Sequence, residues 1–146
     1  KIVVHGDYHP GNLKFCGEEV CGVFDLDWAT LQPRILDIAD GIFLCAGERS
    51  QPIDATSIVS LTQTWTPSPA RTRLFLESYL ESEGITAEEW EVLERVIKAR
   101  WLSCRVSGMA KLPEEQRIDY FVEGLLEPLQ RLETLRPVFE RFLQKA

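Results

Sequence analysis

Residues 5–12 read His-Gly-Asp-Tyr-His-Pro-Gly-Asn and lie between two short apolar segments, Ile2–Val4 and Leu13–Cys16. Short apolar runs bounded by Gly, Pro and Asn are typical of strands that a loop connects. A loop held by strands at both ends presents its side chains from a rigid base. Two imidazoles, a carboxylate and an amide within eight residues are groups that bind substrates and metals, so this loop is the first candidate site.

A predicted hairpin follows the loop and ends in acidic residues. Residues 13–16 and 20–24 read as its two strands, and residues 17–19, Gly-Glu-Glu, read as the turn between them. Asp25 and Asp27 come directly after the second strand. A second group of polar side chains therefore belongs to the same small β region.

Asp7, Asn12 and Asp25 together fit the chemistry of phosphoryl transfer. The spacing from Asp7 to Asn12 is D-x-x-x-x-N, and a further carboxylate follows the next hairpin. In that chemistry one carboxylate accepts the proton of the attacking hydroxyl, while an amide oxygen and a second carboxylate hold Mg²⁺ against nucleotide phosphates. We therefore expect Asp7 as the catalytic base and Asn12 and Asp25 as the magnesium ligands.

The same segments resemble a known family. Residues 5–12 are similar to the catalytic loop of the aminoglycoside phosphotransferase and choline or homoserine kinase-like group, the small-molecule relatives of the protein kinases. Residues 23–29 resemble the metal-binding segment that replaces the Asp-Phe-Gly of protein kinases, and residues 36–39 resemble the Asp-Leu-Ala that opens the next helix. In this family the metal-binding Asp lies about a dozen residues before the helix Asp. The separation 37 − 25 = 12 favours Asp25, and Asp27 becomes an accessory residue.

The resemblance implies a fold, cofactors and an activity. The fold is α+β and mainly α: the C-terminal lobe of a protein-kinase-like fold, with a small hairpin and the catalytic loop packed on a helical body. We expect a single domain over residues 1–146, with residues 1–39 as catalytic core and residues 40–146 as the helical region that selects the acceptor. The implied reaction transfers phosphate from ATP, with Mg²⁺, to a small-molecule hydroxyl. The family's nucleotide-binding lobe is expected upstream of Lys1, so we expect little ATP turnover by the isolated fragment.

Helical periodicity begins near residue 35 and continues to the end of the chain. Ser68 and Pro69 predict a helix start, with an apolar stripe of Leu74, Phe75, Tyr79 and Leu80. Thr86 and Glu89 form a capping box that opens a helix to about residue 109, with a stripe of Trp90, Leu93, Val96, Ile97, Trp101 and Cys104. Pro113 begins another helix, with a stripe of Ile118, Phe121, Val122, Leu125 and Leu126. Residues 47–68 are the least regular, with a short helix expected within residues 53–64.

Composition limits the kinds of partner and location. The chain has 146 residues, of which 45% are hydrophobic and 27% charged, which suits one folded domain and excludes disorder. Sixteen Lys+Arg against 23 Asp+Glu give a net charge of −7, so we expect no nucleic-acid or membrane partner. No apolar run approaches the ~20 residues that span a bilayer, and no signal peptide opens the chain, so we expect a cytoplasmic location.

Several residues have supporting roles in this interpretation. We expect the rings of His5 and His9 to bond loop or hairpin backbone and so to hold Asp7 in place. Asp37 is expected to anchor the catalytic loop or to cap its helix, and Trp65 is the tryptophan considered for substrate contact. The cysteines are expected to be reduced thiols, although Cys16 and Cys21 could face each other across the hairpin. These four cysteines are Cys16, Cys21, Cys45 and Cys104.

Two other functions remain open. His5, Asp7 and His9 alternate along the chain and could be the ligands of a metal-dependent hydrolase. The chain could instead be a non-catalytic lobe that acts as a binding or assembly module, with exposed apolar surface that drives self-association. The identity of the acceptor (aminoglycoside, choline, homoserine or another hydroxyl compound), the choice of ATP or GTP and the oligomeric state stay undecided by the sequence.

Overall fold

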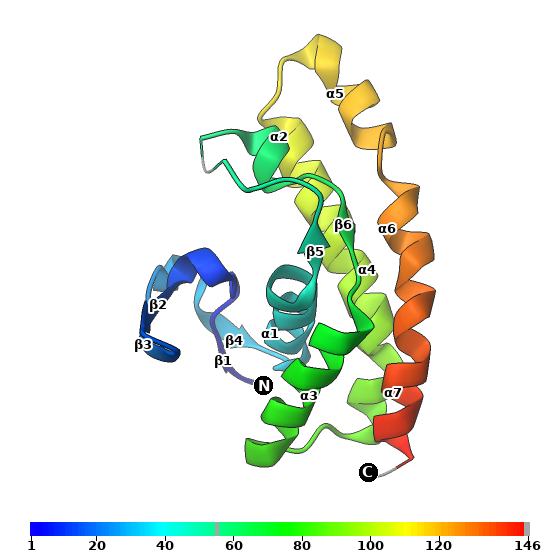
Figure 1. The fold of residues 1–146 in the computed structure, drawn as a ribbon. Coiled ribbons are helices and arrows are strands. Elements are labelled where there is room, and N and C mark those ends of the chain that lie inside the picture. Colours follow the sequence, from blue (N-terminus) through cyan, green and yellow to red (C-terminus); the bar gives the residue numbers. More distant parts are fainter. Residues whose placement is uncertain (55, 145–146) are drawn as a thin grey trace.

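The computed structural model describes residues 1–54 and 56–144 and is mainly helical (Figure 1). Within this part of the chain, three sheets of two strands each accompany the helices. The hairpin region lies to one side of the helical body, and the longest helix runs the length of that body (Figure 1). No helix in the described part of the chain is both long and apolar enough to cross a membrane.

Strand β1 (Ile2–Val4) forms where the sequence predicts it, but its partner was not predicted. It pairs antiparallel with β4 (Thr30–Gln32), so that Val3 lies opposite Leu31. The 25 residues between them, 5–29, leave the sheet and return to its edge. This excursion contains all the residues of the predicted catalytic loop and the predicted acidic pair.

The predicted hairpin is confirmed, with its second strand one residue earlier than expected. Strands β2 (Leu13–Cys16) and β3 (Glu19–Val23) pair antiparallel. Their register passes from Lys14 opposite Gly22 to Phe15 opposite Val20, which leaves Cys21 as the extra residue of a β-bulge.

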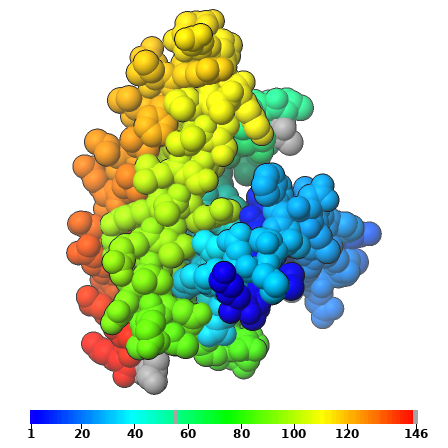
Figure 2. Space-filling model, turned by 180° about the vertical axis from the view of Figure 1, so that it is seen from behind, coloured from blue at the N-terminus to red at the C-terminus, as the bar shows by residue number. Residues whose placement is uncertain are grey.

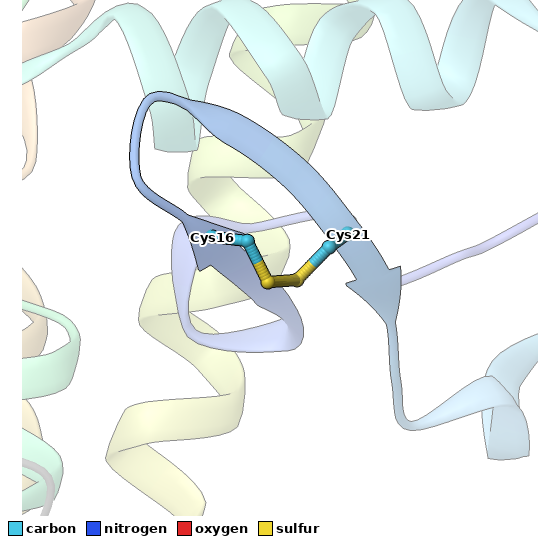
Figure 3. Close-up of a disulfide and its surroundings, with 2 residues drawn as sticks. All are labelled: Cys16 and Cys21. Atoms are coloured by element: carbon cyan, nitrogen blue, oxygen red, sulfur yellow. A yellow bond between two sulfur atoms is a disulfide. The ribbon is translucent and has the colours of Figure 1, made fainter.

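Cys16 and Cys21 form a disulfide across this hairpin (Figure 3), with their Cα atoms 5.8 Å apart. The expectation of four reduced thiols was therefore wrong for this pair, because the bulge at Cys21 brings it within reach of Cys16. Cys45 and Cys104 are free and half-buried, as expected, and burial raises the pKa of the Cys45 thiol to about 11.

The helical body begins with α1 (Ile35–Asp40), which continues as the π-helical segment η3 (Gly41–Ala46). Helix α3 (Pro69–Ser82) and the long helix α4 (Ala87–Ala110) follow, and the capping box of Thr86 and Glu89 is present. The chain then returns along α4 (Figure 1). The returning segments are α5 (Glu114–Val122), α6 (Leu126–Arg131), η4 (Leu132–Leu135) and α7 (Arg136–Leu143). The irregular middle holds β5 (Glu48–Arg49), α2 (Ile58–Leu61) and β6 (Trp65–Thr66).

The core confirms one predicted stripe and corrects two others. In α4, four residues of the predicted stripe are buried: Trp90, Leu93, Ile97 and Trp101. In α3 the stripe is displaced, because Leu76 is buried and Leu74 is exposed. In α5 the prediction was wrong for Ile118 and Val122, which are exposed, because this helix instead turns Tyr120 against the Arg105 guanidinium of α4.

Apolar side chains remain exposed on the N-terminal segment. Figure 2 shows this segment, in blue, projecting beside the helical body. The exposed large apolar residues of the four strands β1–β4, of η2 (Leu26–Trp28) and of the link before η2 are Ile2, Val3, Phe15, Val20, Val23, Phe24, Leu26, Trp28 and Leu31. So many apolar side chains on one small segment exceed what isolated surface residues account for.

Candidate active site

The loop of residues 5–12 is anchored to the helical body by Asp37 of α1. The backbone amides of His5 and Gly6 donate to the two carboxylate oxygens of Asp37, at 2.7 Å and 3.1 Å. Hydrogen bonds to a charged acceptor are among the stronger ones in proteins. Two such bonds to consecutive amides fix the chain direction immediately before Asp7.

Gly6 also brings the loop against the segment that follows the hairpin. Its backbone is left-handed, with φ +79°, and a Cβ at this position would lie 2.5 Å from the backbone oxygen of Trp28. No other residue fits there without displacing backbone, because glycine alone lacks the Cβ. The loop and the η2 segment are therefore in direct backbone contact.

Asp7 lies at the centre of a short hydrogen-bond network. The side-chain amide of Asn12 donates to the backbone oxygen of Asp7 at 2.9 Å and to its carboxylate at 3.3 Å. His9 Nε2 lies 3.4 Å from the same carboxylate oxygen. The Asp7 side chain is 37% exposed, so its carboxylate is oriented by the loop and still open to a substrate.

Both histidine rings bond to backbone. His5 Nδ1 accepts from the Asp7 amide at 3.3 Å, so its proton is on Nε2, which donates to the Phe24 carbonyl at 2.9 Å. His9 Nδ1 accepts from the Gly11 amide at 3.0 Å and caps the short helix η1 (Pro10–Asn12). This is the arrangement expected of rings that hold the loop in shape.

Asn12 and Asp25 offer the oxygen donors that Mg²⁺ prefers. The Asn12 side chain is buried and its nitrogen is directed to Asp7, which leaves Oδ1 as the atom that a cation can use. The Phe24 amide donates to the Asn12 carbonyl at 2.9 Å, so the residue before Asp25 is tied to Asn12. Asp25 is exposed and makes no capping hydrogen bond. The residue types and their backbone link thus fit a magnesium site completed by phosphates and water.

The backbone of Asp25 is itself strained. Its φ of 58° lies in the left-handed region, which costs a non-glycine residue about 1–2 kcal/mol. Such strain is concentrated at sites where a side chain must be aimed. Asp27, the predicted accessory residue, lies two positions further on in η2 and is exposed.

The hydrolase alternative does not fit the histidine geometry. Both nitrogens of His5 and one of His9 are occupied by backbone groups. Among residues 1–54 and 56–144, no group of three or more His, Cys, Asp or Glu side chains could hold a metal ion. A zinc site needs three or four such ligands directed at one point.

Trp65 does not meet the expectation of substrate contact. Its side chain is 2% exposed and packs edge to face on Phe43, with 5.0 Å between ring centroids. The irregular sequence around it shows no sign of a strand, but β6 pairs with β5 and the ring is buried in the core.

Sequence reasoning missed Asp40 and Arg100. Asp40 of α1 is fully buried and receives two hydrogen bonds from Arg100 of α4, at 2.5 Å and 2.8 Å. Burial raises the pKa of the Asp40 carboxyl to about 6, although the Arg100 pair lowers it, and Asp37 and Asp7 raise it further. The two partners are 60 residues apart, so no local spacing could have joined them.

A carboxylate oriented by a neighbouring amide, beside a segment with a further carboxylate, is an arrangement suited to phosphotransferases. Comparison with family models bears out that class. The chain belongs to the phosphotransferase enzyme family called APH, whose model matches residues 1–75, and the resemblance noted in the sequence is thereby confirmed. Searches of curated proteins and of solved structures returned no match.

Proposed function

We propose that the protein transfers the terminal phosphoryl group of ATP, with Mg²⁺, to a hydroxyl of a small molecule. Aminoglycosides, choline and homoserine are the acceptor classes to test first. The observation that carries the proposal is the pair of hydrogen bonds from the Asn12 amide to Asp7, because they join the proposed base to a proposed metal ligand. The membership of residues 1–75 in a phosphotransferase family supports the same reaction class.

In the proposed reaction each residue has a distinct role. Asp7 accepts the proton of the acceptor hydroxyl as that oxygen attacks the terminal phosphorus, while the bond from that phosphorus to its bridging oxygen breaks and ADP leaves. Asn12 Oδ1 and the Asp25 carboxylate hold the metal, and His5, His9 and Asp37 keep the loop in place. When bound, Mg²⁺ supplies positive charge that offsets the charge of the phosphates.

The proposed architecture is the C-terminal lobe of a protein-kinase-like fold. The mainly helical body with a hairpin at its side is compatible with such a lobe. Residues 40–146 would then form the surface that selects the acceptor. Adenine contacts would come from a nucleotide lobe that precedes these segments.

The test uses the full-length native protein with Mg²⁺ and ATP against a panel of hydroxyl acceptors, with ³¹P NMR to identify the phosphorylated product. Asp7→Asn should lower kcat by about 10²–10⁴-fold with little change in nucleotide affinity. Asp119→Asn, an exposed aspartate of α5, is the matched control and should leave kcat unchanged. Turnover by Asp7→Asn within threefold of the parent protein would refute the assigned role. Replacement of ATP by GTP in the same assay decides nucleotide preference.

Assembly is a second candidate function, favoured by the exposed apolar side chains of the N-terminal segment. We expect the 146-residue chain on its own to self-associate through this segment. Light scattering at rising protein concentration measures self-association as an increase in average molar mass. Replacement of Trp28 and Leu31 by Ser should reduce that increase. A monodisperse monomer at high concentration would contradict the expectation.

A further inference from the structure

Asp40 and Arg100 form a charged pair between two helices directly behind the loop. Asp40 is 0% exposed, whereas the Arg100 side chain is 30% exposed. The guanidinium approaches both carboxylate oxygens, which is the two-point geometry that arginine offers and lysine does not. A partly buried pair of this kind adds little stability over apolar packing, so stability alone does not account for it.

Arg100 has a third contact, and that contact reaches the candidate site. Its second terminal nitrogen also donates to the Gly6 carbonyl at 3.4 Å, across 94 positions of sequence. The Gly6 carbonyl belongs to the same rigid peptide group as the amide of Asp7. An interaction at that oxygen therefore acts on the backbone from which the Asp7 side chain projects.

The Gly6 region is thus held from two sides by two helices. Asp37 of α1 accepts from the amides of His5 and Gly6, and Arg100 of α4 donates to the carbonyl that follows. Side chains of the helical body thus accept from two consecutive backbone amides and donate to the next backbone carbonyl. In the Gly6–Asp7 peptide group itself, Arg100 holds the carbonyl and His5 Nδ1 accepts from the amide, so rotation of this peptide would break both bonds.

We propose that Arg100, oriented by Asp40, is a positioning residue that holds the Gly6–Asp7 peptide and so sets the direction of the Asp7 carboxylate. Arg100 touches neither substrate nor metal in this scheme. The inference rests on the proposed role of Asp7 as the base. Its effect on the backbone can nevertheless be measured without any turnover.

The experiment compares Arg100→Ala, Arg100→Lys and the matched control Arg95→Ala in the full-length protein. Arg95 is an exposed arginine of the same helix, and its guanidinium bonds the backbone of its own helix at Glu91. Arg100→Lys keeps the positive charge beside Asp40 and guards against loss of folding in the alanine variant. Lysine lacks the planar fork by which Nε of Arg100 holds one Asp40 oxygen while Nη2 is fixed on the other oxygen and on the Gly6 carbonyl, so its ammonium is not aimed at that carbonyl.

The first readout is amide hydrogen exchange. We expect exchange of the Asp7 amide to accelerate at least about tenfold in both Arg100 variants, with no change in Arg95→Ala and no change at buried amides of α4. The second readout is kinetic: kcat should fall at least about tenfold in Arg100→Ala, with both KM values within about twofold. Added guanidinium at millimolar concentration should partly restore kcat in Arg100→Ala alone, because the side chain it replaces is partly open to solvent.

The outcomes separate the two hypotheses. Parent-like Asp7 exchange in Arg100→Lys and Arg100→Ala overturns the positioning role, whether or not the protein is active. Accelerated Asp7 exchange without detectable phosphotransfer in the parent protein supports the role of Arg100 and overturns the proposed function instead. A fall in kcat that accompanies faster exchange throughout α4 marks a general loss of stability and also overturns the proposal.

Discussion

Replacement of Asp37 by Asn tests the anchor on which the whole loop depends. The Asp37 carboxylate accepts from the amides of His5 and Gly6, at 2.7 Å and 3.1 Å. Asparagine has the same shape, but its side chain offers one oxygen and one NH₂ group. One amide keeps an acceptor that is no longer charged, and the other amide faces a donor.

The size of the effect follows from those two bonds. Hydrogen bonds to a charged group contribute about 1.5–3 kcal/mol each, and one neutral bond contributes about 0.5–1.5 kcal/mol. The variant therefore loses about 2.5–4.5 kcal/mol from the closed loop. Since about 1.4 kcal/mol is tenfold in an equilibrium constant, the open form of the loop should become about 60-fold to 1,600-fold more populated.

Amide hydrogen exchange followed by NMR measures this opening directly. Exchange at His5 and Gly6 should accelerate by the same factor in Asp37→Asn, while amides in the middle of α4 keep their rates. Asp119→Asn, with an exposed side chain on α5, is the control for the loss of one charge. Exchange at His5 and Gly6 within about threefold of the parent protein would refute the anchoring role.

Two further predictions concern a buried carboxyl and the disulfide. Because burial raises the pKa of Asp40 from 3.8 to about 6, its protonated form stabilises the fold below pH 3.8, and that stabilisation is lost as pH rises through 6. The free energy of unfolding in urea should therefore decline from pH 4 to pH 7 in the parent protein but not through this group in Asp40→Asn. The same dependence of that free energy on pH in both proteins would count against the prediction. Replacement of Cys16 and Cys21 by Ser should lower stability by about 2 kcal/mol, as expected for a short closed loop. Dithiothreitol should destabilise the parent protein and leave this variant unaffected, whereas a variant without Cys45 and Cys104 should still respond.

Local signals predicted the elements whose partners lie close in sequence. The capping box of Thr86 and Glu89 and the apolar stripe through Trp101 placed α4 within one or two residues. The hairpin was equally readable, because its turn and both strands lie within residues 13–24. The candidate loop was predicted from local features: the density of polar residues between two strands, the five-position separation of Asp7 and Asn12, and the resemblance of residues 5–12 to a family's catalytic loop.

Long-range pairing accounts for what the sequence did not reveal. Strand β4 has three residues and no turn signal of its own, and it exists because β1 is beside it. The periodicity of α5 indicates a helix but cannot say that Tyr120, rather than Ile118, meets the body. Arg100 is 94 positions from Gly6, so its contact with the loop depends on how α4 packs.

The pairing of β1 with β4 gives residues 5–29 an unusual independence. The two ends of this segment are neighbours in one small sheet, and the pairing of β1 with β4 holds them together. The entropic cost of closing the segment therefore grows only slowly with its length. We therefore expect the fold to tolerate insertions at the hairpin turn and replacement of the whole segment by the corresponding residues of a relative. The replacement segment must keep the hydrogen bonds that its backbone makes with the side chains of Asp37 and Arg100 on the helical body.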